Sequence, residues 1–343
     1  MKQTQPIDPT DPAIAPHFER MREHGIHMIQ VPTPFAVGPV NSYLIDDEPL
    51  TLVDPGPNSG DSLEALKAGV RELGHELEDI QRIIVTHQHI DHLGLVAIVV
   101  ARSDAEVTCL DRCAPWLTDY DAESAAADKF AVAMMQRNGI PADTAIALRS
   151  VSRAFRGWGS SSRVDRVLHD GDTLKFRDRS LQVYHRPGHS VSDTIFWDEP
   201  SGMLIAADHL IKNVSSNPLL ERPRNEGEPR PKSLVSYIAS MKETRKMPAK
   251  LVLSGHGEPI SDHRQLIDDR LELHRNRAEK LIGLLGDEEL TAHDLAHKTW
   301  GNIAVTQAYL TLSEMIGHLD ILVDANRVEA FEVDDIVRYR TVR

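Results

Sequence analysis

The chain has 343 residues, enough for two domains with a packed core. It is 41% hydrophobic and 26% charged, which is ordinary for a globular protein, and its formal net charge of −14 disfavours a protein that mainly grips phosphate backbones, because that affinity comes from Lys and Arg. The polar, Pro-rich residues 1–11 contain no apolar signal segment, and no later run is long enough to span a bilayer. We therefore expect a cytoplasmic protein without membrane contact.

The first third of the chain alternates predicted strands and helices. A Pro-rich arm with a helical turn at 18–24 precedes a predicted hairpin of 27–33 and 40–45. The apolar tip of this hairpin, 34–39, either walls a substrate site or is simply a loop. Further strands are predicted at 50–53, 82–85 and 106–110, with helices at 61–73 and 93–100. This order indicates a layered α/β sheet.

The middle of the chain contains a predicted helical insertion at about 111–162, which we expect to cover the site. Cys109 and Cys113 are interpreted as reduced thiols, because no second cysteine pair completes a zinc knuckle. Beyond the insertion, strands are predicted at 173–176, 180–185, 194–197, 203–207 and 250–253, with a helix at 233–246. The Pro-rich, charged segment 213–232 is predicted to be a surface loop near the substrate mouth.

The C-terminal part is predicted to form a separate domain, so that we divide the chain into 1–263 and 264–343. Helices are expected from 262, at 291–297 and at 305–324, followed by extended pieces at 327–333 and 336–342. Three helices and a hairpin make a winged-helix arrangement, but the candidate recognition helix, 302–326, has no Lys or Arg and carries Glu314, Asp320 and Asp324. Phosphate and guanine contacts need basic side chains, so we expect a structural or substrate-capping role for this tail.

A cluster of metal-ligand residue types follows the predicted strand 82–85. Residues 86–92 read Thr-His-Gln-His-Ile-Asp-His, so His87, His89, Asp91 and His92 lie within six positions. In an extended backbone the rings of His87 and His89 leave on the same side. Imidazoles and a carboxylate gathered at a strand-to-helix turn suit a divalent cation such as zinc. The motif therefore predicts a metal site.

Three later segments have the same form, a strand that ends in a ligand-type residue at a turn. They contain His189, Asp208 and His256. Asp54 follows its own strand and is predicted either to hydrogen-bond a ligand histidine or to be only a turn residue. His209, beside Asp208, could face the substrate or the interior. The remaining histidines of the tail, including His274 and His318, are interpreted as surface or core residues.

The ordered set resembles the metallo-β-lactamase fold superfamily. The motif His87-x-His89-x-Asp91-His92, followed by His189, Asp208 and His256, matches the dinuclear hydrolases of that superfamily over roughly residues 27–263. The chain is similar to the glyoxalase II-like branch, and its tail resembles the winged-helix-like C-terminal domain of some members. The resemblance implies an α/β fold, a four-layer αββα sandwich with the site at the edge where the two sheets meet.

The resemblance also implies how the ligands are shared between two divalent ions, for which we expect Zn²⁺ with Mn²⁺ or Fe as alternatives. His87, His89 and His189 would hold the first ion, Asp91, His92 and His256 the second, and Asp208 would bridge them. Two such ions about 3.5–4 Å apart lower the pKa of a bridging water, so that hydroxide exists near neutral pH. Asp91 would orient this nucleophile and pass on its proton. No covalent role follows for Ser190, Cys109 or Cys113.

The predicted function is hydrolysis of an ester-like bond in a small molecule, such as a thioester or lactone. One alternative is a mononuclear iron sulfur dioxygenase, in which Asp91, Asp208 and His256 would have no role. Another is a nuclease or a metal-stabilised regulator that acts through the tail, which the acidic candidate recognition helix disfavours. The substrate and the oligomeric state stay open at this point.

Overall fold

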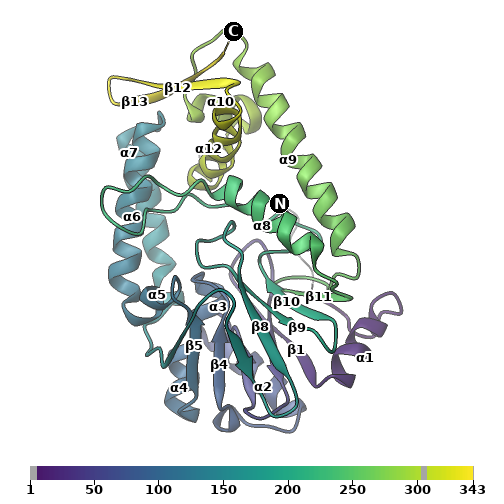
Figure 1. The fold of residues 1–343 in the computed structure, drawn as a ribbon. Coiled ribbons are helices and arrows are strands. Elements are labelled where there is room, and N and C mark those ends of the chain that lie inside the picture. Colours follow the sequence, from purple (N-terminus) through teal and green to yellow (C-terminus); the bar gives the residue numbers. More distant parts are fainter. Residues whose placement is uncertain (1–5, 303–306, 343) are drawn as a thin grey trace.

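The computed structural model describes residues 6–302 and 307–342, and two stacked β-sheets form its lower half (Figure 1). The six-stranded sheet has the order β1 (Ile26–Val31), β2 (Val40–Ile45), β3 (Thr51–Val53), β4 (Arg82–Val85), β5 (Glu106–Leu110) and β6 (Arg166–Leu168). The five-stranded sheet has the order β11 (Leu251–Ser254), β10 (Met203–Ala207), β9 (Thr194–Asp198), β8 (Ser180–His185) and β7 (Thr173–Lys175). The two sheets face each other.

The strands from β3 to β6 run parallel, whereas β1, β2 and β3 are antiparallel. Every residue of β3 and β4 is buried, as expected for short β-branched strands covered on both faces. Their carboxyl ends meet at one edge of the sheet, and Asp54 and Thr86 follow directly there. The parallel pair β10 and β11 brings Asp208 and His256 to the corresponding edge of the second sheet.

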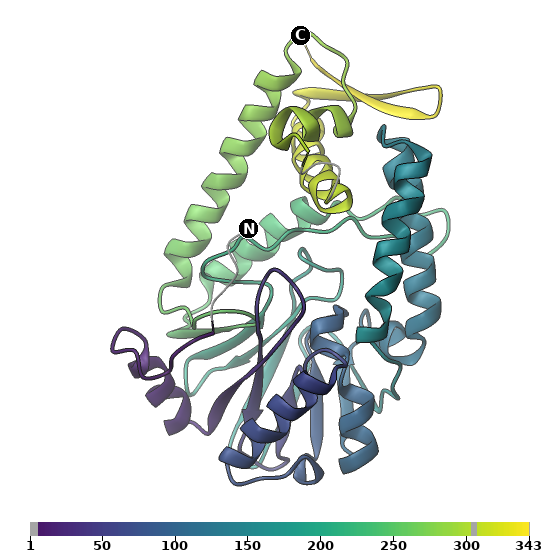
Figure 2. The ribbon, with the colours of Figure 1, turned by 180° about the vertical axis from the view of Figure 1, so that it is seen from behind.

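Helices cover both outer faces of the sheet pair. The first sheet is covered by α2 (Gly60–Glu72), the short α3 (Ile90–Leu93) and α4 (Val96–Ser103), and the second by α8 (Ser233–Lys246) and the start of α9 (His263–Leu285). A central cluster that includes Tyr43, Ile84, Phe196 and Leu253 fills the space between the sheets. The result is the expected four-layer αββα sandwich, with α1 (Ala15–Glu23) at its side (Figures 1 and 2).

The upper half is built from the insertion and the tail (Figure 1). The insertion forms α5 (Ala114–Thr118), α6 (Tyr120–Arg137) and α7 (Ala142–Ala154), and the tail adds α10 (Ala292–Trp300), α12 (Ala308–Asp324) and the hairpin of β12 (Val328–Val333) and β13 (Ile336–Thr341). The pair α6 and α7 stands on one side and α9 on the other, with α12 between them in both views (Figures 1 and 2).

The predicted α/β fold class is confirmed. Within the ranges 6–302 and 307–342, no helix is both long and apolar enough to cross a membrane.

Three expectations about elements need correction or completion. The predicted helix 93–100 is instead two helices, α3 and α4, which separate at Gly94. The Leu95 amide donates to the Gly56 carbonyl at 2.8 Å instead of continuing α3, and neighbouring backbone passes so close that a Cβ at Gly94 would lie 2.3 Å from the Asn58 amide. The strand β6 was not predicted, and the expected helix start at residue 305 lies outside the described residues.

Candidate metal centre

The loop between β4 and α3 places three histidines and one aspartate at the junction of the two sheets. His87 is the second residue after β4, and Asp91 and His92 lie inside α3. The side chains of His87, Asp91 and His92 are buried, and His89 is partly exposed. The loop therefore presents ligand-type side chains from a fully packed strand, which limits their freedom to move.

Three imidazole nitrogens converge at one point of this junction. His89 Nδ1 lies 3.1 Å from His87 Nε2 and 2.8 Å from His189 Nε2. His189 comes from the loop between β8 and β9, a hundred residues later in the chain. The three nitrogens could accordingly serve as ligands of a single ion.

A second group of donors lies beside the first. Asp91, His92 and His256 form it, and Asp91 Oδ2 lies 3.4 Å from His256 Nε2. Asp208 stands between the groups, with its carboxylate oxygens 3.4 Å from His92 Nε2, 3.5 Å from His189 Nε2 and 3.6 Å from His256 Nε2. The structure thus brings all seven predicted ligands into one cluster.

The other ring nitrogen of four histidines is held by the protein. His92 Nδ1 donates to the Asp54 carboxylate at 2.8 Å, and His87 Nδ1 lies 3.0 Å from the Thr86 hydroxyl. His189 donates through Nδ1 to the carbonyl of Asn217 at 3.0 Å, and His256 to that of Pro39 at 2.8 Å. Each bond leaves the Nε2 lone pair directed into the cluster, as metal-binding imidazoles require.

Asp54 also organises the loop itself. Its carboxylate accepts from the Thr86 amide at 2.9 Å and from the Thr86 hydroxyl at 2.6 Å. Asp54 adopts a left-handed backbone conformation with φ 52°, which aspartate tolerates better than most residues. The side chain expected from sequence to support a ligand histidine lies where it can do so.

Burial and charge set the protonation of the cluster. Burial lowers the pKa of His87 well below its ordinary value and that of His89 to about 3, which keeps both imidazoles neutral with a free lone pair. For His92, burial alone would lower the pKa, but the facing carboxylates of Asp208 and Asp54 raise it well above the ordinary value. Neutral His87 and His89 therefore offer free lone pairs, and the carboxylates that favour a proton on His92 would equally favour a cation in place of that proton.

The cluster passes a chemical test for metal binding. His92 Nε2, His256 Nε2 and Asp208 Oδ1 are buried polar atoms without any hydrogen-bond partner among the described residues. Such atoms are costly in a protein interior unless something binds them. Two donors about 2.0–2.2 Å from one tetrahedral ion lie about 3.3–3.6 Å apart, and the Nε2 atoms of His92 and His256 lie 3.4 and 3.6 Å from the Asp208 carboxylate oxygens. The donor set fits divalent cations.

His209 lies away from the cluster. Its side chain is buried, its Nε2 lies 2.9 Å from the Thr244 hydroxyl in α8, and its ring packs against Tyr237. It faces the interior, which the sequence had left open beside a role toward the substrate. A further group of ligand-type residues, His274, Glu314 and His318, joins α9 to α12. The Arg277 guanidinium forms an ion pair with the Glu314 carboxylate, so the negative charge of this group is balanced without a metal ion.

A cavity of about 540 Å³ opens beside the cluster. Gln88, His89, Ile90 and Asp91 line one part of it, and α5, α6, α7, residues 155–156, residues 219–221 and the start of α12 line most of the rest. Phe35, from the tip between β1 and β2, lies in its wall and packs against Phe155 with ring centroids 5.8 Å apart. The hairpin tip therefore walls the cavity, one of the two interpretations that the sequence allowed.

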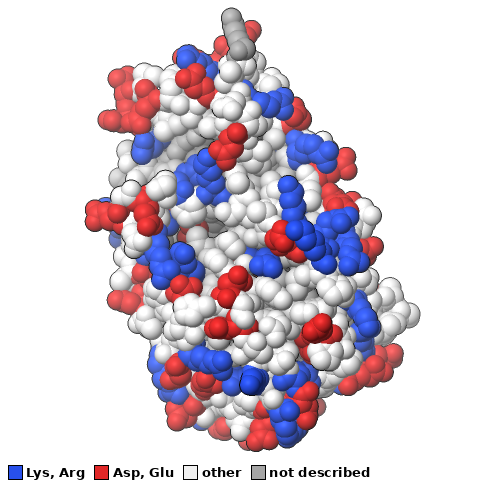
Figure 3. All heavy atoms as spheres, viewed as in Figure 1, with Lys and Arg blue, Asp and Glu red and all other residues white. Residues whose placement is uncertain are grey.

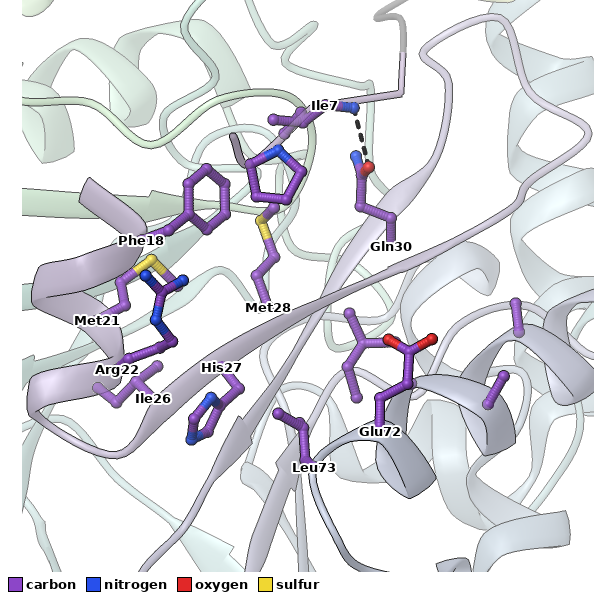
Figure 4. A pocket seen from close by; sticks show the side chains of 15 residues that line it. Ile7, Phe18, Met21, Arg22, Ile26, His27, Met28, Gln30, Glu72 and Leu73 are labelled. Carbon is purple, nitrogen blue, oxygen red and sulfur yellow. Dashed lines mark hydrogen bonds between the residues drawn. The ribbon is translucent and has the colours of Figure 1, made fainter. Parts of the chain in front are cut away.

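A second cavity, of about 380 Å³, lies between α1, β1 and α2 (Figure 4). His27 and Glu72 are among its lining residues, together with apolar side chains such as Phe18 and Met28 (Figure 4). None of the seven clustered residues lines it. It is a feature separate from the candidate metal centre.

The family model of the Metallo-beta-lactamase superfamily matches residues 36–256, which contain the whole cluster. The chain belongs to this superfamily. The probable metallo-hydrolase YqjP of Bacillus subtilis (strain 168) is 30% identical over 323 residues, covering 94% of this chain and 100% of that protein. Membership agrees with the mixed α/β sandwich, with a hydrolytic function and with divalent metal binding at the His and Asp cluster.

Two solved structures resemble nearly the whole chain. The metallo-beta-lactamase family protein TTHA1429 from Thermus thermophilus has a TM-score of 0.75 at 26% identity, over 93% of this chain and 99% of that one. A Beta-lactamase domain protein from Burkholderia ambifaria has a TM-score of 0.71 at 24% identity, over 92% of both chains. BJP-1, a subclass B3 metallo-beta-lactamase of Bradyrhizobium japonicum, has a TM-score of 0.51 at 19% identity and covers only 75% of this chain.

Several residues of the site carry no sequence signal of their own. Pro39 and Asn217 act through backbone carbonyls, which any residue could supply. Gln88 joins the loop to residue 221, since its Nε2 donates to Glu221 Oε1 at 2.9 Å. The position of Gln88 between His87 and His89 is the one sequence feature that indicates a role for it at the site.

Proposed function

We propose that this protein is a hydrolase that uses two divalent cations, most simply Zn²⁺, to cleave an ester-like bond such as a thioester or lactone. The observation that carries the proposal is the convergence of seven donors, three of which have buried polar atoms without a partner among the described residues. His87, His89 and His189 would hold one cation, and Asp91, His92 and His256 the other, with Asp208 shared. Bound there, the cations would supply Lewis-acid activation of water and of the substrate carbonyl.

The residues of the chain itself would orient the reaction. Asp54, Thr86, Asn217 and the carbonyl of Pro39 fix the imidazole rings, so that the donors need little rearrangement on binding. Asp91 belongs to the cluster and also lines the cavity, so its carboxylate is placed to accept the proton of the attacking water. The apolar cavity walls would exclude bulk water from the reacting bond.

A small-molecule substrate is proposed rather than a nucleic acid, and the tail is the main reason. Its described residues include α9, α10, α12 and the β12–β13 hairpin, and α12, which would take the place of a recognition helix in a winged helix, is almost entirely buried. Its acidic Glu314 and Asp320 already pair with Arg277 and Arg230 of the same chain. On the face seen in Figure 3, Lys and Arg are interspersed with Asp and Glu among the described residues. We infer a glyoxalase II-like hydrolase with a capping tail.

The test is the metal content of protein purified without added metal, measured together with turnover of a panel of thioesters and lactones. Two zinc or manganese ions per chain and hydrolysis are expected. Replacing His87 by Ala should abolish turnover, while His297→Ala, on an exposed position of α10, should leave it unchanged. One iron per chain with oxygen uptake would contradict the proposal and support an iron dioxygenase.

A further inference from the structure

The cavity beside the metal centre has a lining that indicates what kind of molecule enters it. It is about 540 Å³, within the range of about 300–1,000 Å³ typical of ligand pockets. Most of its wall is apolar and comes from four separate parts of the chain: α5, α6, α7 and α12, through Trp116, Val132, Leu148 and Tyr309 among others. A ligand that fills it would bury an extended apolar body.

Two arginines interrupt this apolar wall on the side of α7. Arg149 and Arg156 both line the cavity, together with Asp128 and Ser152. Arg156 donates to the Asp128 carboxylate and, at 3.0 Å, to the Ser124 carbonyl. The Nε of Arg149 lies 3.9 Å from the same carboxylate. One buried aspartate is therefore shared between guanidinium groups.

The positive charge at this place exceeds the negative charge. Arg153 also approaches Asp128, at 3.8 Å, so three guanidinium groups surround one carboxylate. The Nε atoms of Arg149 and Arg156 are buried and have no hydrogen-bond partner among the described residues. The side chains of Arg149 and Arg156 are 35% and 24% exposed, so an anionic ligand in the cavity can reach their guanidinium groups and balance the excess positive charge. The same site would bind a neutral chain end less well.

We propose that the substrate carries an extended apolar chain ending in an anionic group, which Arg149 and Arg156 bind while the ester-like bond lies at the metal centre. This rests on the proposed hydrolase function for the reacting end. A carboxylate or a phosphate would meet the same chemistry at the two guanidinium groups. Arg149 is then a specificity-determining residue, and Arg156 combines this role with holding the turn Arg156–Trp158, which follows α7, to α6.

The test separates binding of the chain end from hydrolysis. Calorimetric titration of the metal-loaded protein with decanoate, decanol and butyrate should give about tenfold tighter binding of decanoate than of either other probe. Arg149→Gln should remove most of the difference between decanoate and decanol. Arg153→Gln is the matched control, because Arg153 lies near Asp128 but does not line the cavity. Any binding of the decanoate carboxylate to the metal ions should be the same in Arg149→Gln and Arg153→Gln, so it cancels in the comparison.

Hydrolysis supplies the second measurement. The p-nitrophenyl monoester of decanedioic acid should have a kcat/KM about tenfold above that of its methyl-capped counterpart, and Arg149→Gln should equalise the two. Equal turnover of both substrates by the unmodified protein, or unchanged preferences in Arg149→Gln, would overturn the proposal. Absence of turnover with every ester, while the Arg149-dependent binding persists, would instead refute the hydrolase and support the binding site. A preference for phosphate-ended chains that Arg149→Gln abolishes also supports the site.

Discussion

The shared position of Asp208 depends on the absence of a side chain at residue 255. A Cβ on Gly255 would lie 2.1 Å from Asp208 Oδ1 and 3.0 Å from the His92 ring. Asp208 itself follows Ala207, whose φ of 43° and irregular pairing at the end of β10 turn the next side chain toward the cluster. Close packing and local backbone strain together place one carboxylate between two groups of imidazoles.

Gly255→Ala is therefore expected to impair metal binding more than folding. The added methyl group would displace the Asp208 carboxylate from the cluster, so that metal affinity should fall by about tenfold or more. Metal retention during dialysis against a chelator measures this loss, and circular dichroism follows the fold. The matched control is Gly283→Ala in α9, where an added Cβ would meet no atom within 4 Å. Equal metal retention in both variants would contradict the expectation.

At the scale of elements, the segment between β10 and α8 connects the metal centre to its surroundings. Asn217 accepts from His189 through its carbonyl and donates through Nδ2 to the Leu310 carbonyl of α12 at 3.0 Å. Glu221 accepts from Gln88 of the histidine loop and lines the cavity. Burial raises the pKa of Glu221 to about 8, with a further increase from the Asp193 carboxylate. The side chain is accordingly protonated at neutral pH.

This protonation should make stability depend on pH. Between the ordinary Glu value of 4.5 and about 8, the folded protein binds a proton at Glu221 that the unfolded chain lacks, so the free energy of unfolding falls as pH rises through this window. Glu221→Gln should reduce the fall by at least about 1.4 kcal/mol, the equivalent of one pKa unit. Urea unfolding of the metal-loaded protein at about pH 6 and 8.5 measures it. Glu226→Gln, exposed on the same segment, should behave like the unmodified protein.

At the scale of the whole molecule, the insertion and the tail share one hydrophobic core. Met135, Ile140 and Ala145 of the insertion belong to the same buried cluster as Leu281, Leu295 and Leu319 of the tail. Gly317 of α12 lies so close to α8 that a Cβ there would be 2.8 Å from Leu234. The division at residue 263 stays a prediction, and the insertion, which belongs to the first part, packs against the tail in this cluster.

A half-buried ion pair connects the segment before α8 to the tail. Arg230 donates to both oxygens of Asp320, at 2.7 and 2.8 Å. Asp320→Asn should lower the free energy of unfolding by about 1–3 kcal/mol, because a charge-assisted bidentate contact is lost and Arg230 stays partly buried. Asp324→Asn removes a pair with Lys232 that is more exposed and should cost at most about 1 kcal/mol. Equal midpoints of urea unfolding for the two variants would contradict this difference.

The sequence by itself determined the chemistry of the ligands. The spacing of His87, His89, Asp91 and His92 after a β-branched strand, and the glycine turns around His189 and His256, are local features that predict both the fold class and the metal site. They are readable because parallel strands bring their carboxyl ends to a common edge, whatever the rest of the chain does. The strand at 166–168 and the break at Gly94 were missed, since both depend on neighbours distant in the chain.

Only the tertiary structure decided what surrounds the metal centre. Residues from the hairpin tip, the insertion and α12 become neighbours in the cavity although up to 275 positions separate them, as for Phe35 and Leu310. The direction of His209, the sharing of Asp128 between arginines and the carbonyl contacts of Pro39 and Asn217 likewise follow from packing. Side-chain types and their periodicity encode which groups can bind a metal, whereas long-range packing decides which groups a substrate meets.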